Sequence, residues 1–167
     1  MQKPLNCRVI ANGKRIHDPW DTVLPIQMYA NHEIAERQVT GAVMQRILLA
    51  EDHDDNREML MRRLTRAGFE VRGASDGQDA LSQALAWKPD LVLMDVSMPV
   101  MSGLDATRLI RAELGGTIKV IALTAHAMNE SREACFEAGC DAFATKPVDW
   151  PNLMEEMNRQ FQGRTAS

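Results

Sequence analysis

Short apolar runs alternate with segments of helical periodicity from residue 46 onward. The run at 47–50 is apolar at every position, which is typical of a central strand buried on both faces of a sheet. The run at 69–72 alternates between apolar and polar residues and indicates an edge strand. We expect three further strands, at 91–94, 119–123 and 142–144.

The segments between and after these strands predict five helices. We expect Asp55 to cap the first, with Glu58 three residues later in a capping-box arrangement. The other helices are expected to begin at Asp76–Gly77, at about 104 and 129, and after Asp149. Apolar stripes on three of the helices should face the core: Leu60, Leu64 and Ala67; Ala80, Leu81, Ala84 and Leu85; and Leu153, Met157 and Phe161.

Strict alternation of five strands with five helices predicts an α/β fold with a doubly wound parallel sheet. Because crossovers between parallel strands are right-handed, the helices should cover both faces of the sheet. Ligand sites in such sheets lie outside the carboxyl ends of the strands. The residues that follow each strand are therefore the first candidates for chemistry.

The first 43 residues show no clean period and are interrupted by Pro4, Pro19 and Pro25. We therefore divide the chain into an N-terminal extension at 1–43, a domain at 44–163 and a short tail at 164–167. We expect the extension to be disordered or a dispensable addition, with Met44 as the natural start of the domain.

Charge and hydropathy exclude several classes of function. A formal net charge of −4 leaves no basic stripe of the kind that binds nucleic acid. No apolar run approaches the about 20 residues that a membrane helix needs, and residues 1–10 contain no signal-peptide core. We expect a cytoplasmic protein that contacts neither nucleic acid nor membrane.

The first polar side chains after four of the expected strands form one set: Glu51, Asp52, Asp95, Thr124 and Lys146. Because the carboxyl ends of parallel strands meet at one edge, we expect these side chains to converge. Three carboxylates held close together repel one another strongly, so the cluster requires a cation. Oxygen ligands and an affinity for phosphate favour Mg²⁺.

The same residues suit transfer of a phosphoryl group to a carboxylate. A carboxylate can attack phosphorus, a lysine can pair with the added group, and a threonine hydroxyl can donate to it. Taken singly, each residue has an ordinary structural interpretation: Asp52 as a capping or solvated acid, Asp95 as a loop acid, Lys146 as a surface lysine and Thr124 as a strand cap. Their joint placement at four strand ends favours a common site.

Four stretches resemble the receiver domains of two-component signalling: ILLAEDHDDNRE (47–58), PDLVLMDVSMPVMSGLDATR (89–108), IALTA (121–125) and ATKPVD (144–149). The resemblance covers about residues 46–162. It implies a flavodoxin-like fold similar to that of the chemotaxis regulators, with five strands in the order 2-1-3-4-5.

The resemblance also implies roles for individual residues. Asp95 would be the phosphoacceptor, and Thr124 and Lys146 would bind the phosphoryl oxygens. Four residues would hold Mg²⁺, the last of them through water: Asp52, Asp95, the backbone carbonyl of Ser97, and Glu51.

Three further positions are interpreted from the same resemblance. Phe143 stands where the family has an aromatic residue that rotates on activation, although a plain core residue is an equal interpretation. His126, near the expected mouth, either sets the phosphate lifetime or is a solvated loop histidine. Ser102 stands where many members have Asp, and it can still cap the next helix.

The implied function is phosphorelay signal transduction. A histidine kinase or a histidine phosphotransfer protein would donate the phosphoryl group, and the last strand with its two flanking helices would then contact an output protein. We expect a single-domain receiver that acts as a switch and not as an enzyme. Two alternatives stay open: an aspartate-nucleophile phosphohydrolase, which would place an acid where Ser97 stands, and an interaction module that is never phosphorylated.

Overall fold

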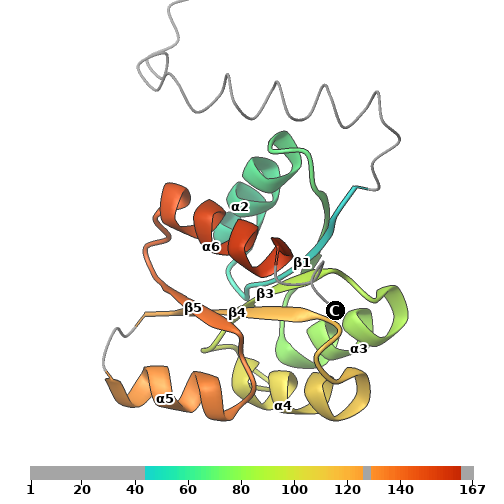
Figure 1. Ribbon diagram of the computed structural model, residues 1–167, viewed down its shortest axis with the longest axis vertical. Coiled ribbons are helices and arrows are strands. Elements are labelled where there is room, and N and C mark those ends of the chain that lie inside the picture. The colour runs from blue at the N-terminus through green and yellow to red at the C-terminus, as the bar shows by residue number, and fades with distance from the viewer. Residues whose placement is uncertain (1–43, 126–128, 163–167) are drawn as a thin grey trace, which may run out of the picture. The chain divides into compact units, whose positions relative to one another are not determined.

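The computed structural model describes residues 44–125 and 129–162, which belong to one compact unit, 43–167 (Figure 1). Its strands are β1 (Arg46–Ala50), β2 (Glu70–Ala74), β3 (Leu91–Asp95), β4 (Lys119–Thr124) and β5 (Ala142–Thr145). Its helices are α2 (Asp54–Arg66), α3 (Gly77–Trp87), α4 (Gly103–Leu114), α5 (Asn129–Glu137) and α6 (Trp150–Gln162). The predictions for 1–43, for 164–167 and for His126 lie outside the described residues.

The strands form one parallel sheet in the order β2-β1-β3-β4-β5 (Figure 1). This confirms the predicted flavodoxin-like architecture, with β2 at an edge. Strand boundaries differ little from the predicted ones; β2 starts one residue later, at Glu70, and continues to Ala74. None of the helices within the described ranges is long and apolar enough to cross a membrane.

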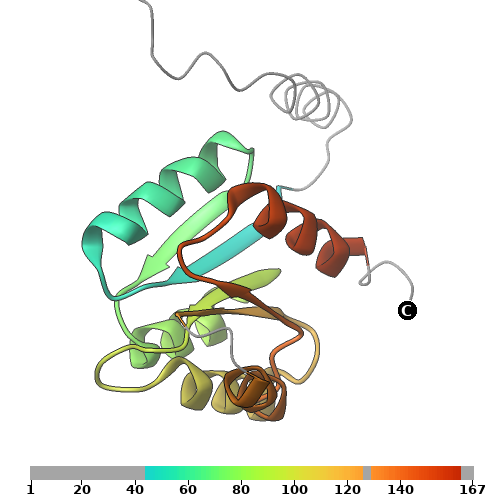
Figure 2. The ribbon, with the colours of Figure 1, turned by 90° about the vertical axis from the view of Figure 1, so that its left-hand side faces the viewer.

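Helices cover both faces of the sheet (Figure 2). Because successive side chains of a strand point to opposite faces, β1 divides between two cores. Ile47 and Leu49 pack toward α2 and α6, and Leu48 packs toward α3, α4 and α5. All three side chains are fully buried, as the unbroken apolar run predicts for a central strand.

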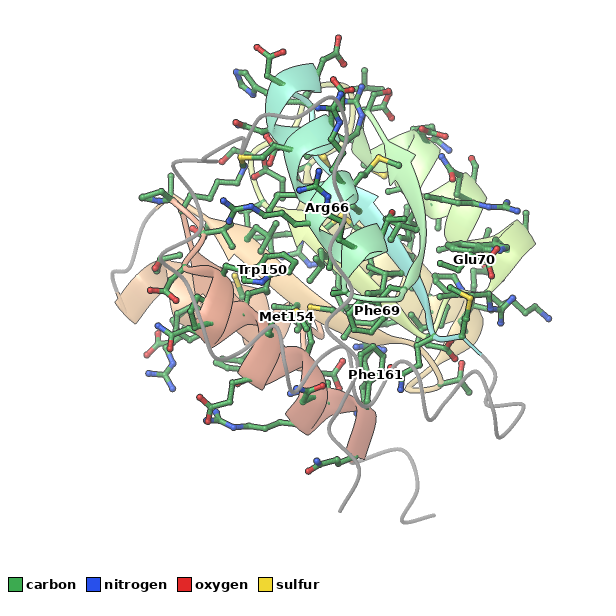
Figure 3. All side chains as sticks on the ribbon, turned by 90° about the horizontal axis from the view of Figure 1, so that it is seen from above. Arg66, Phe69, Glu70, Trp150, Met154 and Phe161 are labelled. Atoms are coloured by element: carbon green, nitrogen blue, oxygen red, sulfur yellow. The ribbon has the colours of Figure 1, made fainter. Side chains whose placement is uncertain are left out.

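α6 packs over the core that contains Ile47 and Leu49, next to the segment that joins α2 to β2. Phe161 stacks on Phe69, with ring centroids 5.9 Å apart. Figure 3 shows Met154 on the same side of α6 as Phe161. The Arg63 guanidinium of α2 lies over the Trp150 ring at 5.7 Å from its centroid. The predicted stripe of Leu153, Met157 and Phe161 is confirmed as buried.

Three predicted helix caps are confirmed. Asp76 accepts from the Asp79 backbone N–H, Ser102 from that of Asp105, and Asp149 from that of Asn152. The serine at 102 thus caps its helix as an aspartate would, which supports the view that this substitution has little consequence.

The predicted start of α2 is wrong. The helix begins at Asp54 with His53 at the N-cap position, so Asp55 lies inside the first turn and Glu58 completes no capping box. Two acids in the first turn both gain from the helix dipole, and this favours a start that includes them. Leu85 of the second stripe is 37% exposed, because Ala80 and Ala84 face the sheet and Leu85 turns past the edge of that face.

Candidate functional site

The predicted polar residues lie together at the carboxyl ends of the strands. They follow or end four strands, namely β1 (Glu51 and Asp52), β3 (Asp95), β4 (Thr124) and β5 (Lys146). The parallel register aligns these ends, since Ala50 pairs with Met94 and Thr124 with Thr145. The next residues along β1 and β3 are Glu51 and Asp95, and they therefore emerge side by side.

Lys146 links the two buried carboxylates of this edge. Its Nζ lies 2.6 Å from Asp95 Oδ2 and 2.6 Å from Glu51 Oε2. The side chains of Glu51 and Asp95 are only 1% and 5% exposed. Burial acts to lower the pKa of Lys146, but the hydrogen bonds and charges of the two carboxylates outweigh it and raise the pKa. The lysine is therefore a firmly charged partner for both acids.

Glu51 is held from α2 as well as from β5. Asn56 Nδ2 donates to Glu51 Oε1 over 3.3 Å, and Arg57 Nη1 donates to the Glu51 carbonyl oxygen over 2.7 Å. Sequence reasoning missed both residues. Their signal was a position near the start of the helix that directly follows the acids of β1.

Asp52 pairs with the residue that follows it. His53 Nδ1 lies 2.9 Å from Asp52 Oδ1 and 3.7 Å from Glu51 Oε1. The hydrogen bond to Asp52 and the charge of Asp52 raise the pKa of the His53 ring, which remains 73% exposed. Glu51, Asp52 and His53 each offer a ligand atom, and these atoms lie within 4.8 Å of one another. Sequence reasoning missed His53, whose signal was its place directly after the two acids.

The loop between β3 and α4 folds back toward Asp95. The Ser97 backbone N–H donates to Asp95 Oδ1 over 3.0 Å, so Ser97 lies beside the carboxylate. A Cβ at Gly103 would lie 1.9 Å from the Asp95 carbonyl oxygen, so only glycine lets α4 begin this close to β3. Within the loop, Val100 has a φ of +66° and is 87% exposed.

Thr124 and Phe143 occupy different parts of the β4–β5 region. Thr124 is buried, and its carbonyl oxygen accepts from the Lys146 backbone N–H over 2.7 Å. Phe143 is half-buried in an edge-to-face contact with Phe136 of α5, with centroids 6.2 Å apart. The Arg132 guanidinium lies 5.1 Å from the Phe143 centroid. Thr124 thus joins the strand-end residues, whereas Phe143 belongs to the surface of β5 and α5.

Comparison with known proteins decides the family. The model described as the response regulator receiver domain matches residues 47–158. The chain belongs to the receiver domain family. This receiver matches the chemotaxis protein CheY4 of Vibrio cholerae with a TM-score of 0.67 and 28% identity, over 70% of this chain and 98% of that one.

A second solved structure is the receiver domain of the sensor histidine kinase PA1611 from Pseudomonas aeruginosa PAO1. It matches with a TM-score of 0.65 and 37% identity, over 71% of this chain and 98% of that one. A magnesium ion is coordinated in the active site cleft of that protein.

Two curated relatives of this receiver are much longer kinases. It is 40% identical over 134 residues to hybrid signal transduction histidine kinase I of Dictyostelium discoideum, which covers 74% of this chain and 8% of that protein. It is 42% identical over 102 residues to the sensor histidine kinase RcsC of Escherichia coli K12, which covers 61% of this chain and 11% of that protein. The chain therefore spans about a tenth of the length of these relatives.

The atoms at the strand ends of this receiver fit a magnesium ion. Glu51, Asp52 and Asp95 bring three carboxylates, whereas Lys146 brings one ammonium, so negative charge is in excess unless a cation binds. Asp52 is 24% exposed, which leaves one side of the cluster open to solvent. Hard oxygen donors with access to water suit Mg²⁺, which keeps several waters when it binds protein.

Proposed function

We propose that this receiver accepts a phosphoryl group on Asp95 from a histidine kinase or a histidine phosphotransfer protein, in a Mg²⁺-dependent step of a phosphorelay. The observation that carries the proposal is the buried Asp95 carboxylate with its Oδ2 at 2.6 Å from the Lys146 ammonium. A nucleophile and a cation for the incoming phosphoryl oxygens are thereby adjacent. The magnesium-containing Pseudomonas relative, 37% identical, supports the metal requirement.

The transfer forms one bond and breaks another. An Asp95 carboxylate oxygen would attack phosphorus, and the P–N bond to the histidine of the donor would break. The leaving imidazole keeps the electron pair of that bond and takes up a proton. Lys146 would donate to a phosphoryl oxygen in place of Asp95, and Thr124 would donate its hydroxyl to another.

Mg²⁺, when bound, would supply positive charge next to the phosphoryl oxygens during transfer. Four residues of this chain would hold it, with Glu51 acting through water: Asp52, Asp95, the Ser97 backbone carbonyl, and Glu51. The contact between Ser97 N–H and Asp95 Oδ1 supports this assignment, because it keeps the loop beside the carboxylate.

Phosphorylation would then change a protein-binding surface. The new group adds nearly two negative charges and three strong acceptors, which compete with Glu51 for Lys146. The backbone hydrogen bond from Lys146 to Thr124 ties the ends of β5 and β4, so movement of either residue is passed to the other. Phe143 lies in β5 against α5, and we propose that the surface of α5, β5 and α6 contacts the output protein.

As in its family, this receiver would be a phosphoacceptor switch without turnover of external substrates. Cys135 and Cys140 are buried free thiols, which supports a reducing compartment such as the cytoplasm. The proposed partners are proteins, and the net charge of −4 gives no support for nucleic acid.

Intact-mass spectrometry after incubation with acetyl phosphate and Mg²⁺ tests the proposal. The wild type should gain one phosphoryl group, and Asp95→Asn should gain none. Asp105→Asn is the matched control, because it removes an exposed carboxylate from α4, and it should react at the wild-type rate.

Two results would contradict the proposal. Phosphorylation of Asp95→Asn at the wild-type rate would show that another residue is the acceptor. Release of many equivalents of phosphate from a small phosphate ester would favour a phosphohydrolase. A wild type that neither binds Mg²⁺ nor reacts would instead be an interaction module.

A further inference from the structure

His53 occupies the N-cap of α2, yet its ring makes no capping hydrogen bond to the helix. Residues at this position usually stabilise the helix by accepting from a backbone N–H of the first turn. Here the ring turns to the strand-end acids instead, with Nδ1 at 2.9 Å from Asp52 Oδ1. A ring nitrogen of His53 therefore lies beside the strand-end carboxylates and does not cap the helix.

The spacing of these atoms matches that of ligands around one ion. Neighbouring ligands of an octahedral ion at about 2.1 Å lie about 3 Å apart. His53 Nδ1 is 2.9 Å from Asp52 Oδ1, so an ion could replace the proton that these two atoms share, and it is 3.7 Å from Glu51 Oε1, a longer distance that leaves Glu51 to act through water. Glu51 is anchored by Asn56 and Lys146, whereas the His53 side chain is 73% exposed and has room to rotate.

A nitrogen ligand changes which ions such a site prefers. Mg²⁺ favours oxygen and keeps its waters, and it gains little from an imidazole. Divalent first-row transition ions bind imidazole well, and their affinities rise from Mn²⁺ through Co²⁺ to Cu²⁺. A mixed nitrogen–oxygen set therefore increases the preference for these ions over Mg²⁺.

We propose that His53 Nδ1 ligates the ion at this site beside Asp52, with Glu51 acting through water, so that the receiver binds divalent first-row transition ions, with Co²⁺ as the probe, far more tightly than Mg²⁺. This inference rests on the proposed metal site beside Asp95. It assigns the ion preference of that site to one exposed side chain that the phosphoryl-transfer step does not use.

Isothermal titration of the full chain with Co²⁺ and, separately, with Mg²⁺ tests the proposal. The matched variant is His53→Asn, whose amide nitrogen stands at the place of Nδ1 and can still donate to Asp52. Loss of a metal-site partner usually lowers affinity at least about tenfold, and we expect this drop for Co²⁺. In His53→Asn, water or the amide oxygen can take the place of the imidazole, from which Mg²⁺ gains little. We therefore expect the Mg²⁺ affinity to change by about twofold or less.

Two controls locate the Co²⁺ that is measured. The chain has four histidines and three cysteines, so weak binding elsewhere must be separated from this site. Mg²⁺ should compete with the tight Co²⁺, and Asp52→Asn should lose both ions. At saturating Co²⁺, the visible absorption spectra of wild type and His53→Asn should differ, because the ligand set changes from mixed to all-oxygen.

The inference is overturned if His53→Asn keeps the wild-type Co²⁺ affinity, because the ring would then only hold Asp52 by a hydrogen bond. It is also overturned if Mg²⁺ fails to displace the tight Co²⁺. In either case, wild-type phosphorylation with Mg²⁺ would leave the proposed function intact. A wild type that binds no Mg²⁺ and accepts no phosphoryl group would defeat both.

Discussion

Each end of the parallel sheet carries a group of charged residues, and the two groups have opposite balances. At the amino end of β4, Asp141 pairs with Arg111 and with Lys119, whose Nζ lies 2.8 Å from Asp141 Oδ1. At the carboxyl end, Lys146 pairs with Glu51 and Asp95. At the amino end the one carboxylate has two cationic partners, whereas at the carboxyl end two carboxylates share one cation and leave negative charge uncompensated.

The amino-end group is also closed by backbone groups. The Val120 N–H donates to Asp141 Oδ2 over 2.8 Å, and Arg111 Nε donates to the Gly139 carbonyl oxygen over 2.6 Å. Arg111 reaches the Ile118 carbonyl oxygen as well. The hydrogen bonds of Arg111 thus join the end of α4 to the starts of β4 and β5. The same residue types therefore close the amino end with internal hydrogen bonds and ion pairs, and leave excess negative charge at the carboxyl end.

Asp141→Asn should have the largest effect on stability. The change leaves Arg111 and Lys119 partly buried without their counter-charge, and breaking such an arrangement costs about 3 kcal/mol. Urea denaturation should show this loss in the free energy of unfolding, and Asp105→Asn on the exposed face of α4 should leave that free energy almost unchanged. A loss below about 1 kcal/mol for Asp141→Asn would show that the amino end does not depend on this charge balance.

Added Mg²⁺ should raise the free energy of unfolding by binding at the carboxyl ends of the strands. An ion that binds the folded state alone adds RT ln(1 + [Mg²⁺]/Kd), which is about 1.4 kcal/mol at tenfold excess over Kd. Thermal unfolding should show this gain in the wild type and equally in Asp141→Asn, and should show much less of it in Asp95→Asn. An equal gain in Asp95→Asn would place the ion elsewhere.

Without metal, Asp95→Asn should stabilise the fold, opposite in sign to Asp141→Asn. Removing one of the crowded acids relieves repulsion, while Lys146 keeps its bond to Glu51, and we expect a gain of about 1 kcal/mol. Urea denaturation in the presence of a chelator measures it. A loss of stability would mean that the Lys146–Asp95 pair outweighs the repulsion, and the contrast between the two ends would disappear.

The fold and the convergence of the strand-end residues were predictable because they rest on short-range patterns. The unbroken apolar run at 47–50 predicted a central strand, and the polar residue after each strand predicted its end. The start of α2 was not predictable in the same way, because Asp54 and Asp55 are both acceptable in a first turn.

The partners of the strand-end acids depend on side-chain direction as well as on sequence position. His53 is adjacent to Asp52 in sequence, but an N-cap residue ordinarily faces the helix, and its turn toward the acid is visible only in three dimensions. Likewise, the Arg111–Asp141 pair joins residues separated by 30 positions, and no local period marks it. Long-range ion pairs of this kind follow from the completed packing.

Val100 gives the smallest expected effect and locates strain at the carboxyl end. Its φ of +66° is unfavourable for a β-branched residue, and the side chain is 87% exposed, so little packing offsets it. Val100→Asn, which tolerates this conformation, should raise the free energy of unfolding by about 0.5 kcal/mol. Val100→Ile keeps the branched Cβ and should give no gain, so equal stabilities of the two variants would contradict strain at this position. A gain confined to Asn would show that the loop beside Asp95 holds strain in the same part of the molecule where charge is left uncompensated.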